Sequence, residues 1–152
     1  MTPQISDQIH ATCIAIDGQG VLLRGASASG KSDLALRLID AGAELVADDR
    51  VDLQSSDGIL RAAAPAQLTG LLEVRGIGIL RFAASQDAPV AVICDLSPFK
   101  EIERLPVERH VDLLNVKIPA FSIDPFEPSA MNKVQLALAL SNGSIMRGDD
   151  TT

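Results

Sequence analysis

The residues Gly25–Ser32 read G-A-S-A-S-G-K-S and fit the spacing G-x-x-x-x-G-K-[S/T]. Small side chains between the two glycines leave room for the backbone to wrap a phosphate group. In this pattern the lysine reaches the β- and γ-phosphates of a nucleotide, and the last hydroxyl binds Mg²⁺. The alternative is a Gly/Ser-rich connection that binds nothing. The residues expected to bind phosphate are Gly25, Ala26, Ser27, Ala28, Ser29, Gly30, Lys31 and Ser32.

Two adjacent carboxylates, Asp48 and Asp49, follow the apolar run at residues 45–47. In isolation, two aspartates at a strand end are equally typical of a turn. Beside a phosphate-binding loop, one carboxylate can accept the proton of a hydroxyl that is being phosphorylated, and the other can orient it or hold a metal-bound water. The residue types alone do not rank Asp49 above Asp48 for proton transfer.

A third group lies at residues 72–79, where Glu73 and Arg75 are two positions apart. In a strand this spacing places both side chains on one face. Glu73 could then bind the metal while Arg75 contacts a phosphate. A surface ion pair is the alternative.

The elements that must position these groups follow from the apolar pattern. Helices are predicted at residues 31–41, where Leu34 and Leu38 repeat at i, i+4 before Gly42, and at residues 129–140. Two strands flank Asp57-Gly58, a tight turn covers residues 17–20, and Pro119 is expected to close the last strand. The other predicted strands cover residues 9–16, 21–24, 45–47, 90–94 and 111–118. Strand, loop, helix and strand in this order predict an α/β fold, a mostly β central sheet flanked by helices, with the loop at the carboxyl end of a strand.

The composition limits the classes of function. With 152 residues, 47% hydrophobic and 22% charged, the chain predicts one globular domain at residues 1–140 and a flexible tail at 141–152. The formal charge of -7 argues against nucleic-acid binding, which requires a basic face. We therefore expect a nucleotide to be held by a few placed cations and backbone donors.

The two cysteines, Cys13 and Cys94, lie within apolar runs, which favours buried reduced thiols over a disulfide and indicates the cytoplasm. Residues 1–10 lack the pattern of a secretion signal, and no apolar run approaches the roughly 20 residues needed to span a bilayer. Secretion and membrane insertion are not expected.

Three blocks in order resemble the catalytic domain of bacterial HPr kinase/phosphorylase. They are residues 25–32, L-V-A-D-D-R-V at 45–51, and A-A-P at 63–65 leading to L-L-E-V-R-G-I-G at 71–78. The resemblance covers about residues 9–118. It implies that ATP and Mg²⁺ are used to phosphorylate a serine of HPr, a phosphocarrier of the sugar phosphotransferase system. It also implies a reverse phosphorolysis that yields pyrophosphate, and a ring-shaped homo-oligomer, usually a hexamer.

The resemblance also implies roles for single residues. It assigns proton transfer to Asp49, the second of the pair, and metal binding to Glu73 together with Ser32. His10 matches a functional histidine before the phosphate loop, and Arg104 resembles a functional arginine. Without the family, His10 would be an ordinary histidine beside a strand and Arg104 a solvated charge.

The chain departs from the family pattern after Pro119. A Pro-x-x-x-Gly-Arg-Asn stretch tied to the reverse reaction is expected there, whereas residues 120–128 read A-F-S-I-D-P-F-E-P and contain no arginine. Asp124 and Glu127 add negative charge instead. Typical members also carry an N-terminal domain and a long C-terminal helix, so this chain resembles a minimal catalytic core. We therefore expect the forward reaction with ATP to be retained and the reverse reaction to be weak.

These observations predict an ATP-dependent serine kinase that acts on an HPr-like phosphocarrier. A kinase of the same fold that acts on a small molecule is the second interpretation. A third, from a different class, is a nucleotide-responsive regulator that binds ATP and a partner without turnover.

Overall fold

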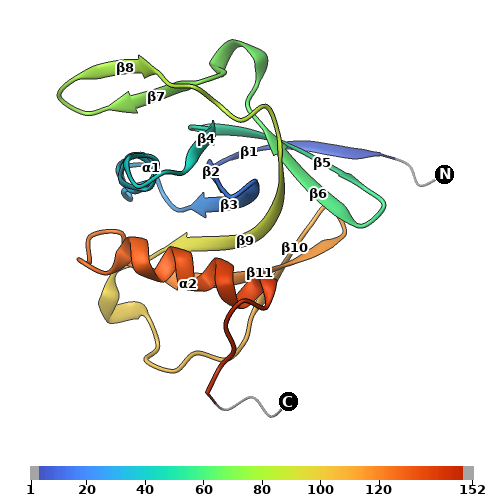
Figure 1. Ribbon diagram of the computed structural model, residues 1–152, viewed down its shortest axis with the longest axis vertical. Helices are drawn as coiled ribbons and strands as arrows, with labels where there is room; N and C mark the ends of the chain where they lie inside the picture. The colour runs from blue at the N-terminus through green and yellow to red at the C-terminus, as the bar shows by residue number, and fades with distance from the viewer. Residues whose placement is uncertain (1–3, 149–152) are drawn as a thin grey trace.

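The computed structural model describes residues 4–148 and has a mixed α/β fold in which a curled sheet is flanked by helices (Figure 1). This confirms the predicted fold class. The helices are α1 (Lys31–Asp40) and α2 (Ala130–Asn142), and short 3₁₀ turns lie at Ala66–Leu68 and Phe99–Glu101. The strands are β1 Ile5–His10, β2 Thr12–Ile16, β3 Gln19–Arg24, β4 Glu44–Ala47, β5 Arg50–Ser56, β6 Ile59–Ala63, β7 Leu71–Val74, β8 Gly78–Arg81, β9 Ala88–Leu96, β10 His110–Leu113 and β11 Val116–Ile123.

The main sheet has the order β1-β5-β6-β9-β3-β2-β4. Strand β11 pairs with β9 on the side opposite β3, and β10 pairs with β11. Strands β3 and β9 are parallel, whereas β2 runs antiparallel to both β3 and β4. The carboxyl ends of β3, β4 and β9 therefore meet the amino end of β2 at one edge of the sheet. The hairpin of β7 and β8 forms a separate sheet and projects from the main one (Figure 1).

Apolar side chains fill both faces of this sheet because they alternate along its strands. One face packs against the two helices, and its buried members include Ile14, Val21, Leu23, Leu34, Leu38, Val134 and Leu138. The opposite face is covered where the sheet curls over itself, and its members include Cys13, Leu22, Leu53, Leu60, Ile93 and Ile118. Strands β2 and β3 are thus held from both sides, which fixes the loop that leaves β3.

The predicted strand at residues 9–16 is wrong as a single element. The chain breaks at the buried Ala11, whose N–H donates to the Asp49 carbonyl at 3.3 Å. Before the break β1 pairs with β5, with His10 opposite Arg50, and after it β2 pairs with β3 and β4. The apolar pattern gave no sign of this break, because Ile9 before it packs against the core and Cys13 after it is buried in the core.

The predicted strand at 111–118 is also wrong. It is a hairpin in which Leu114 and Asn115, with φ of 50° and 67°, connect β10 to β11. Positive φ at both positions matches a two-residue hairpin turn, and neither residue is the glycine that normally marks one. Pro119 does not close the strand, because β11 continues to Ile123 and pairs with β9 only from Ala120 onward. The missing N–H of Pro119 therefore costs no bond to β9.

Most other expectations for local structure are confirmed within one to three residues. Helix α1 ends at Asp40, α2 continues two residues beyond Leu140, and a strand lies on each side of Asp57-Gly58. Residues 149–152 of the predicted tail lie outside the described residues. No helix within residues 4–148 has the length and apolar character required to cross a membrane.

Both cysteines are buried and free, as expected. Burial raises the pKa of Cys13 and of Cys94 to about 12, so both thiols stay protonated near neutral pH. These side chains act as small apolar groups of the core.

Candidate active site

The phosphate-loop residues connect β3 directly to α1, and their geometry explains the two glycines. A Cβ atom at Gly25 would lie 2.6 Å from the Ser29 Oγ. Gly30 has a φ of 101°, where a Cβ would also meet the Pro125 ring at 3.0 Å. Ala28 adopts a φ of 63° without being glycine, which marks a tightly wound loop. The N–H of Leu34 donates to the Gly30 carbonyl at 2.9 Å and begins the helix.

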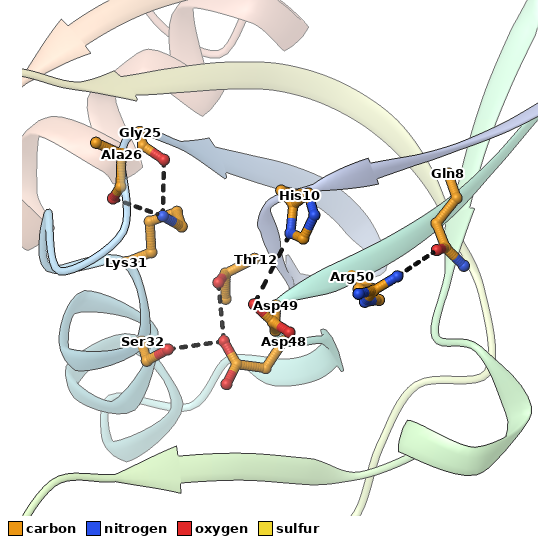
Figure 2. A network of polar contacts seen from close by, with 10 residues as sticks. All are labelled: Gln8, His10, Thr12, Gly25, Ala26, Lys31, Ser32, Asp48, Asp49 and Arg50. Atoms are coloured by element: carbon orange, nitrogen blue, oxygen red, sulfur yellow. Dashed lines mark hydrogen bonds and ion pairs between the residues drawn. The ribbon is translucent and has the colours of Figure 1, made fainter.

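Lys31 folds back over its own loop (Figure 2). Its Nζ donates to the carbonyl oxygens of Gly25 at 2.7 Å and Ala26 at 2.9 Å. The ammonium therefore lies over the loop, and two of its three N–H donors are used by these carbonyls. The Ser29 hydroxyl is buried at the loop base and has no hydrogen-bond partner within the described residues.

Asp48 is the centre of the polar network (Figure 2), and only 8% of its surface is exposed. Its Oδ1 accepts hydrogen bonds from the Ser32 hydroxyl at 2.8 Å and the Thr12 hydroxyl at 2.9 Å. Its Oδ2 accepts the backbone N–H of Glu73 at 3.4 Å. The first aspartate thus joins the phosphate loop to β2 and β7. Thr12 was missed by the sequence analysis, because a threonine at the start of an apolar strand carries no motif.

Asp49 differs from its neighbour in both backbone and exposure. The N–H of Arg50 donates to the Asp48 carbonyl at 2.8 Å across Asp49, whose φ is 69°. A bond between residues i and i+2 around a positive φ defines the rare, strained form of the γ-turn. The side chain is 73% exposed, with Oδ1 4.0 Å from the His10 Nδ1. The positive φ turns the Asp49 carboxylate away from Asp48 and into solvent beside His10.

The side chains of Glu73, Arg75 and Arg104 make no hydrogen bond to Asp48 in the described part of the chain. Glu73 is in β7 with an exposed side chain, and only its backbone contacts Asp48. Arg75 is not in the strand, because β7 ends at Val74 and the chain turns, so the expected pairing of residues 73 and 75 on one face is wrong. Arg104 is exposed in the connection between the 3₁₀ turn at Phe99–Glu101 and β10. The structure therefore does not bring Arg75 or Arg104 into the Asp48 network.

The segment that departs from the family pattern packs against the phosphate loop. Pro125 lies beside Gly30, and its carbonyl accepts a hydrogen bond from Arg37 of α1. Asp124 accepts the backbone N–H of Phe126 at 2.8 Å, and Glu127 forms an ion pair with Lys133 at 2.7 Å. The negative charge expected from Glu127 is thus present, and Lys133 offsets it locally.

A second charged group lies where β3 and β9 end. Asp95 accepts hydrogen bonds from Arg24 at 2.7 Å and 3.1 Å and from Arg109 at 2.9 Å. Burial by itself raises the pKa of Asp95, but the hydrogen bonds and charges of the two arginines outweigh it and hold this pKa below its ordinary value. Arg24 directly precedes the phosphate loop, so this cluster fixes where the loop begins. Sequence reasoning did not find it, because its members are 14 and 71 residues apart.

The donor set at the sheet edge is compatible with Mg²⁺. This ion usually keeps several waters and binds through one or two carboxylates plus substrate phosphates. The Ser32 hydroxyl and the Asp48 carboxylate supply oxygen donors beside the loop, and the backbone of Glu73 is adjacent. Residues 4–148 contain no group of three or more His, Cys, Asp or Glu side chains arranged to hold a metal.

The fold and the site define a mixed α/β domain in which a loop with the G-x-x-x-x-G-K-S pattern contacts the first of two adjacent aspartates. The chain matches the family described as HPr Serine kinase C-terminal domain over residues 3–142, and it belongs to that family. It is 33% identical over 146 residues to HPr kinase/phosphorylase of Clostridium kluyveri, covering 89% of this chain and 47% of the relative. It is 39% identical over 127 residues to HPr kinase/phosphorylase of Lactiplantibacillus plantarum, covering 76% and 40%.

Among solved structures, the HPr(Ser) kinase/phosphatase from Coxiella burnetii aligns with a TM-score of 0.76 and 29% identity, covering 91% of this chain and 90% of that one. The chain spans about half the length of the curated relatives. The resemblance inferred from the three sequence blocks is therefore confirmed at the level of the family and the fold.

Proposed function

We propose that this domain transfers the γ-phosphoryl group of ATP, with Mg²⁺, to a serine hydroxyl of an HPr-like phosphocarrier protein. The observation that carries the proposal is the 2.8 Å hydrogen bond between the Ser32 hydroxyl and Asp48, which joins the phosphate loop to the aspartate pair. The names of the relatives support the substrate class, and family membership supports the reaction.

The nucleotide phosphates bind to the backbone N–H groups of the loop and to the amino end of α1, where the helix dipole favours negative charge. Lys31 exchanges its two carbonyl contacts, to Gly25 and Ala26, for charge-assisted hydrogen bonds to phosphate oxygens, which are stronger. The 3.0 Å approach that a Cβ at Gly30 would make to Pro125 explains why a side chain there would disturb this loop.

Ser32 would hold Mg²⁺ through an oxygen lone pair while its O–H stays donated to Asp48, and Glu73 is the proposed additional ligand. When bound, the ion neutralises charge on the phosphate oxygens. Asp48 is buried and already accepts two hydroxyl donors, so it orients the metal-binding hydroxyl and is unsuited to collect a proton from substrate.

Asp49 is the group that accepts the proton. As the substrate oxygen forms its bond to the γ-phosphorus, the bond between that phosphorus and the β–γ bridging oxygen breaks, and ADP leaves. The serine proton passes to the exposed Asp49 carboxylate, with His10 at 4.0 Å to hold its orientation. Arg75 and Arg104 are exposed cations that we propose contact phosphate or the protein substrate from outside the network.

We further propose, from the resemblance, that the domain acts in the cytoplasm as part of a homo-oligomer, with a hexamer expected. The partner is the phosphocarrier protein, with no role for nucleic acid or membrane. Size-exclusion chromatography with light scattering measures the oligomer directly.

The proposal is tested by incubating the protein with labelled ATP, Mg²⁺ and purified HPr. We expect label on HPr, none on HPr whose target serine is replaced by alanine, and almost none with Lys31→Ala. Turnover of ATP with a small molecule but no labelled HPr would favour a small-molecule kinase. Nucleotide binding without any turnover would favour a regulatory module, and either result would remove the proposed function.

A further inference from the structure

We propose that Thr12 is a positioning residue that holds Asp48 in place and, through it, sets the affinity for Mg²⁺ at Ser32. The inference rests on the proposed function and extends it to a residue outside the family motifs. Thr12 is fully buried, and its hydroxyl donates to the same Asp48 oxygen that accepts the Ser32 hydroxyl (Figure 2).

The place of Thr12 in the sheet makes this role possible. The phosphate loop follows β3 and the aspartate pair follows β4, but these strands are not neighbours, because β2 lies between them. Thr12 begins β2, and β2 runs antiparallel to both strands, so Thr12 lies at the edge where β3 and β4 end. Backbone pairing on both sides, Thr12 with Leu23 and Cys13 with Ala47, fixes its position. The backbone of Thr12 thus lies between the strands that carry the two halves of the site, and its hydroxyl reaches Asp48 at 2.9 Å.

The chemistry follows from two hydroxyl donors on one carboxylate oxygen. Each donor restricts rotation of the Asp48 side chain, and the Thr12 donor comes from a rigid strand, whereas the Ser32 donor comes from the end of the phosphate loop. With Thr12 in place, Asp48 stays aligned to accept the hydrogen bond from the Ser32 hydroxyl, which would leave the lone pairs of the Ser32 oxygen available to hold the metal. Groups that orient a metal ligand typically change metal affinity by 10- to 100-fold when removed.

A purely structural role predicts something different. A buried threonine whose hydroxyl merely satisfies a buried carboxylate would affect thermal stability and leave the dependence on Mg²⁺ unchanged. The two readings are separated by measuring metal affinity and stability on the same variants.

The test uses the full chain and a fluorescent ATP analogue titrated with Mg²⁺. Thr12→Val keeps the shape and removes the donor, and we expect its apparent Kd for Mg²⁺ to rise about ten-fold or more. Thr12→Ser keeps the hydroxyl and should bind Mg²⁺ within about two-fold of the natural protein. The matched control is Ser55→Ala, which removes another buried hydroxyl, one that donates to the Leu114 carbonyl at 2.8 Å. We expect it to lower Tm without changing the Mg²⁺ titration.

Phosphorylation of HPr supplies a second readout. For Thr12→Val the rate should recover as Mg²⁺ is raised, because the effect falls on metal affinity more than on kcat. An unchanged Mg²⁺ titration in Thr12→Val, or a Thr12→Ser as weak as Thr12→Val, would overturn the proposal. If Thr12→Val does not fold, Thr12→Ala measured at low temperature must show the same weak Mg²⁺ binding.

Failure of this inference and failure of the proposed function give different results. If HPr is never labelled but nucleotide binding depends on Mg²⁺ and on the Thr12 hydroxyl, the proposed function fails and the role of Thr12 stands. If HPr is labelled and Thr12→Val shows the natural Mg²⁺ response, the function stands and the role of Thr12 fails.

Discussion

Replacement of Asp49 by asparagine tests the division of labour between the two aspartates. Asparagine tolerates the φ of 69° at this position and keeps the side-chain shape, so the γ-turn should persist. The carboxylate is 73% exposed and its ion pair with His10 is 4.0 Å long, so we expect Tm to change by no more than about 2 °C. Loss of the proton acceptor should lower kcat by about 10² to 10⁴ with nucleotide affinity nearly unchanged.

The matched variant is Asp48→Asn, which should behave in the opposite way. Its amide would turn an NH₂ donor toward either the Ser32 and Thr12 hydroxyls or the Glu73 N–H, so at least one buried donor loses its acceptor. That loss costs about 1–3 kcal/mol of folding free energy, or a Tm lower by about 2–12 °C for a chain of this size. Mg²⁺-dependent nucleotide binding should weaken as well.

Initial rates of HPr labelling, nucleotide titrations and thermal melts on both variants complete the comparison. A near-normal kcat for Asp49→Asn, together with a slow Asp48→Asn that binds nucleotide normally, would show that the roles are reversed.

Three further predictions concern the rest of the site. Lys31→Ala should lower HPr labelling by several orders of magnitude while the Tm stays close to that of the natural protein. Near-normal activity would contradict the assignment of residues 25–32 as a phosphate-binding loop. The folded-state pKa of Asp95 lies below its ordinary value of 3.8, so its stabilising contribution is present above that value and is lost as the pH falls through the folded pKa. The Tm of the natural protein should therefore fall more steeply below about pH 4 than that of Asp95→Asn, and parallel curves would contradict the reasoning. Phosphoserine-HPr with phosphate and Mg²⁺ should release pyrophosphate slowly at millimolar phosphate, and a rate comparable to the forward reaction would show that some other cation serves the reverse step.

The sequence predicted the parts of the fold whose signals are local. The two glycines, the lysine and the following i, i+4 apolar repeat lie within a dozen residues, and the structure has a tight loop and α1 at that place. The turn at Asp17-Gly18 and the strand that follows it were likewise predicted, because glycine readily adopts the positive φ that such a turn requires. Such features depend on neighbours along the chain and therefore survive without knowledge of the tertiary structure.

The errors occurred where the backbone departs from its local propensity. The turn at Leu114 and Asn115 has positive φ at both positions without glycine, so a strand-like pattern of apolar residues at 111–118 concealed a hairpin. At Ala11 the chain passes from one pair of neighbours to another, and only the partners β5, β3 and β4 reveal the change. In both cases the pairing between strands overrides the local preference for one extended strand.

The site shows the same division. Residue types identified Ser32 and the two aspartates as candidates, but only the structure separates a buried Asp48 with three donors from an exposed Asp49 in a strained turn. The role of Thr12 depends on its contact with Asp48, 36 positions along the chain, and that of Asp95 on its contact with Arg24, 71 positions away. Pairings at such separations follow from the order of strands in the sheet, which a single sequence does not state.

The segment after β11 connects these observations, because it meets the phosphate loop from a different part of the chain. Pro125 packs on Gly30, its carbonyl accepts a hydrogen bond from Arg37 of α1, and Asp124 accepts the N–H of Phe99 at 3.0 Å. The segment thus ties the loop to α1 and to the connection that carries Arg104. Residues 120–128 contain no Lys or Arg, and Glu127 pairs with Lys133 beside them, so this segment adds no cation for a second phosphate. Because two phosphate groups at contact distance need cations to offset their repulsion, we expect the forward reaction with ATP to exceed the reverse reaction with inorganic phosphate.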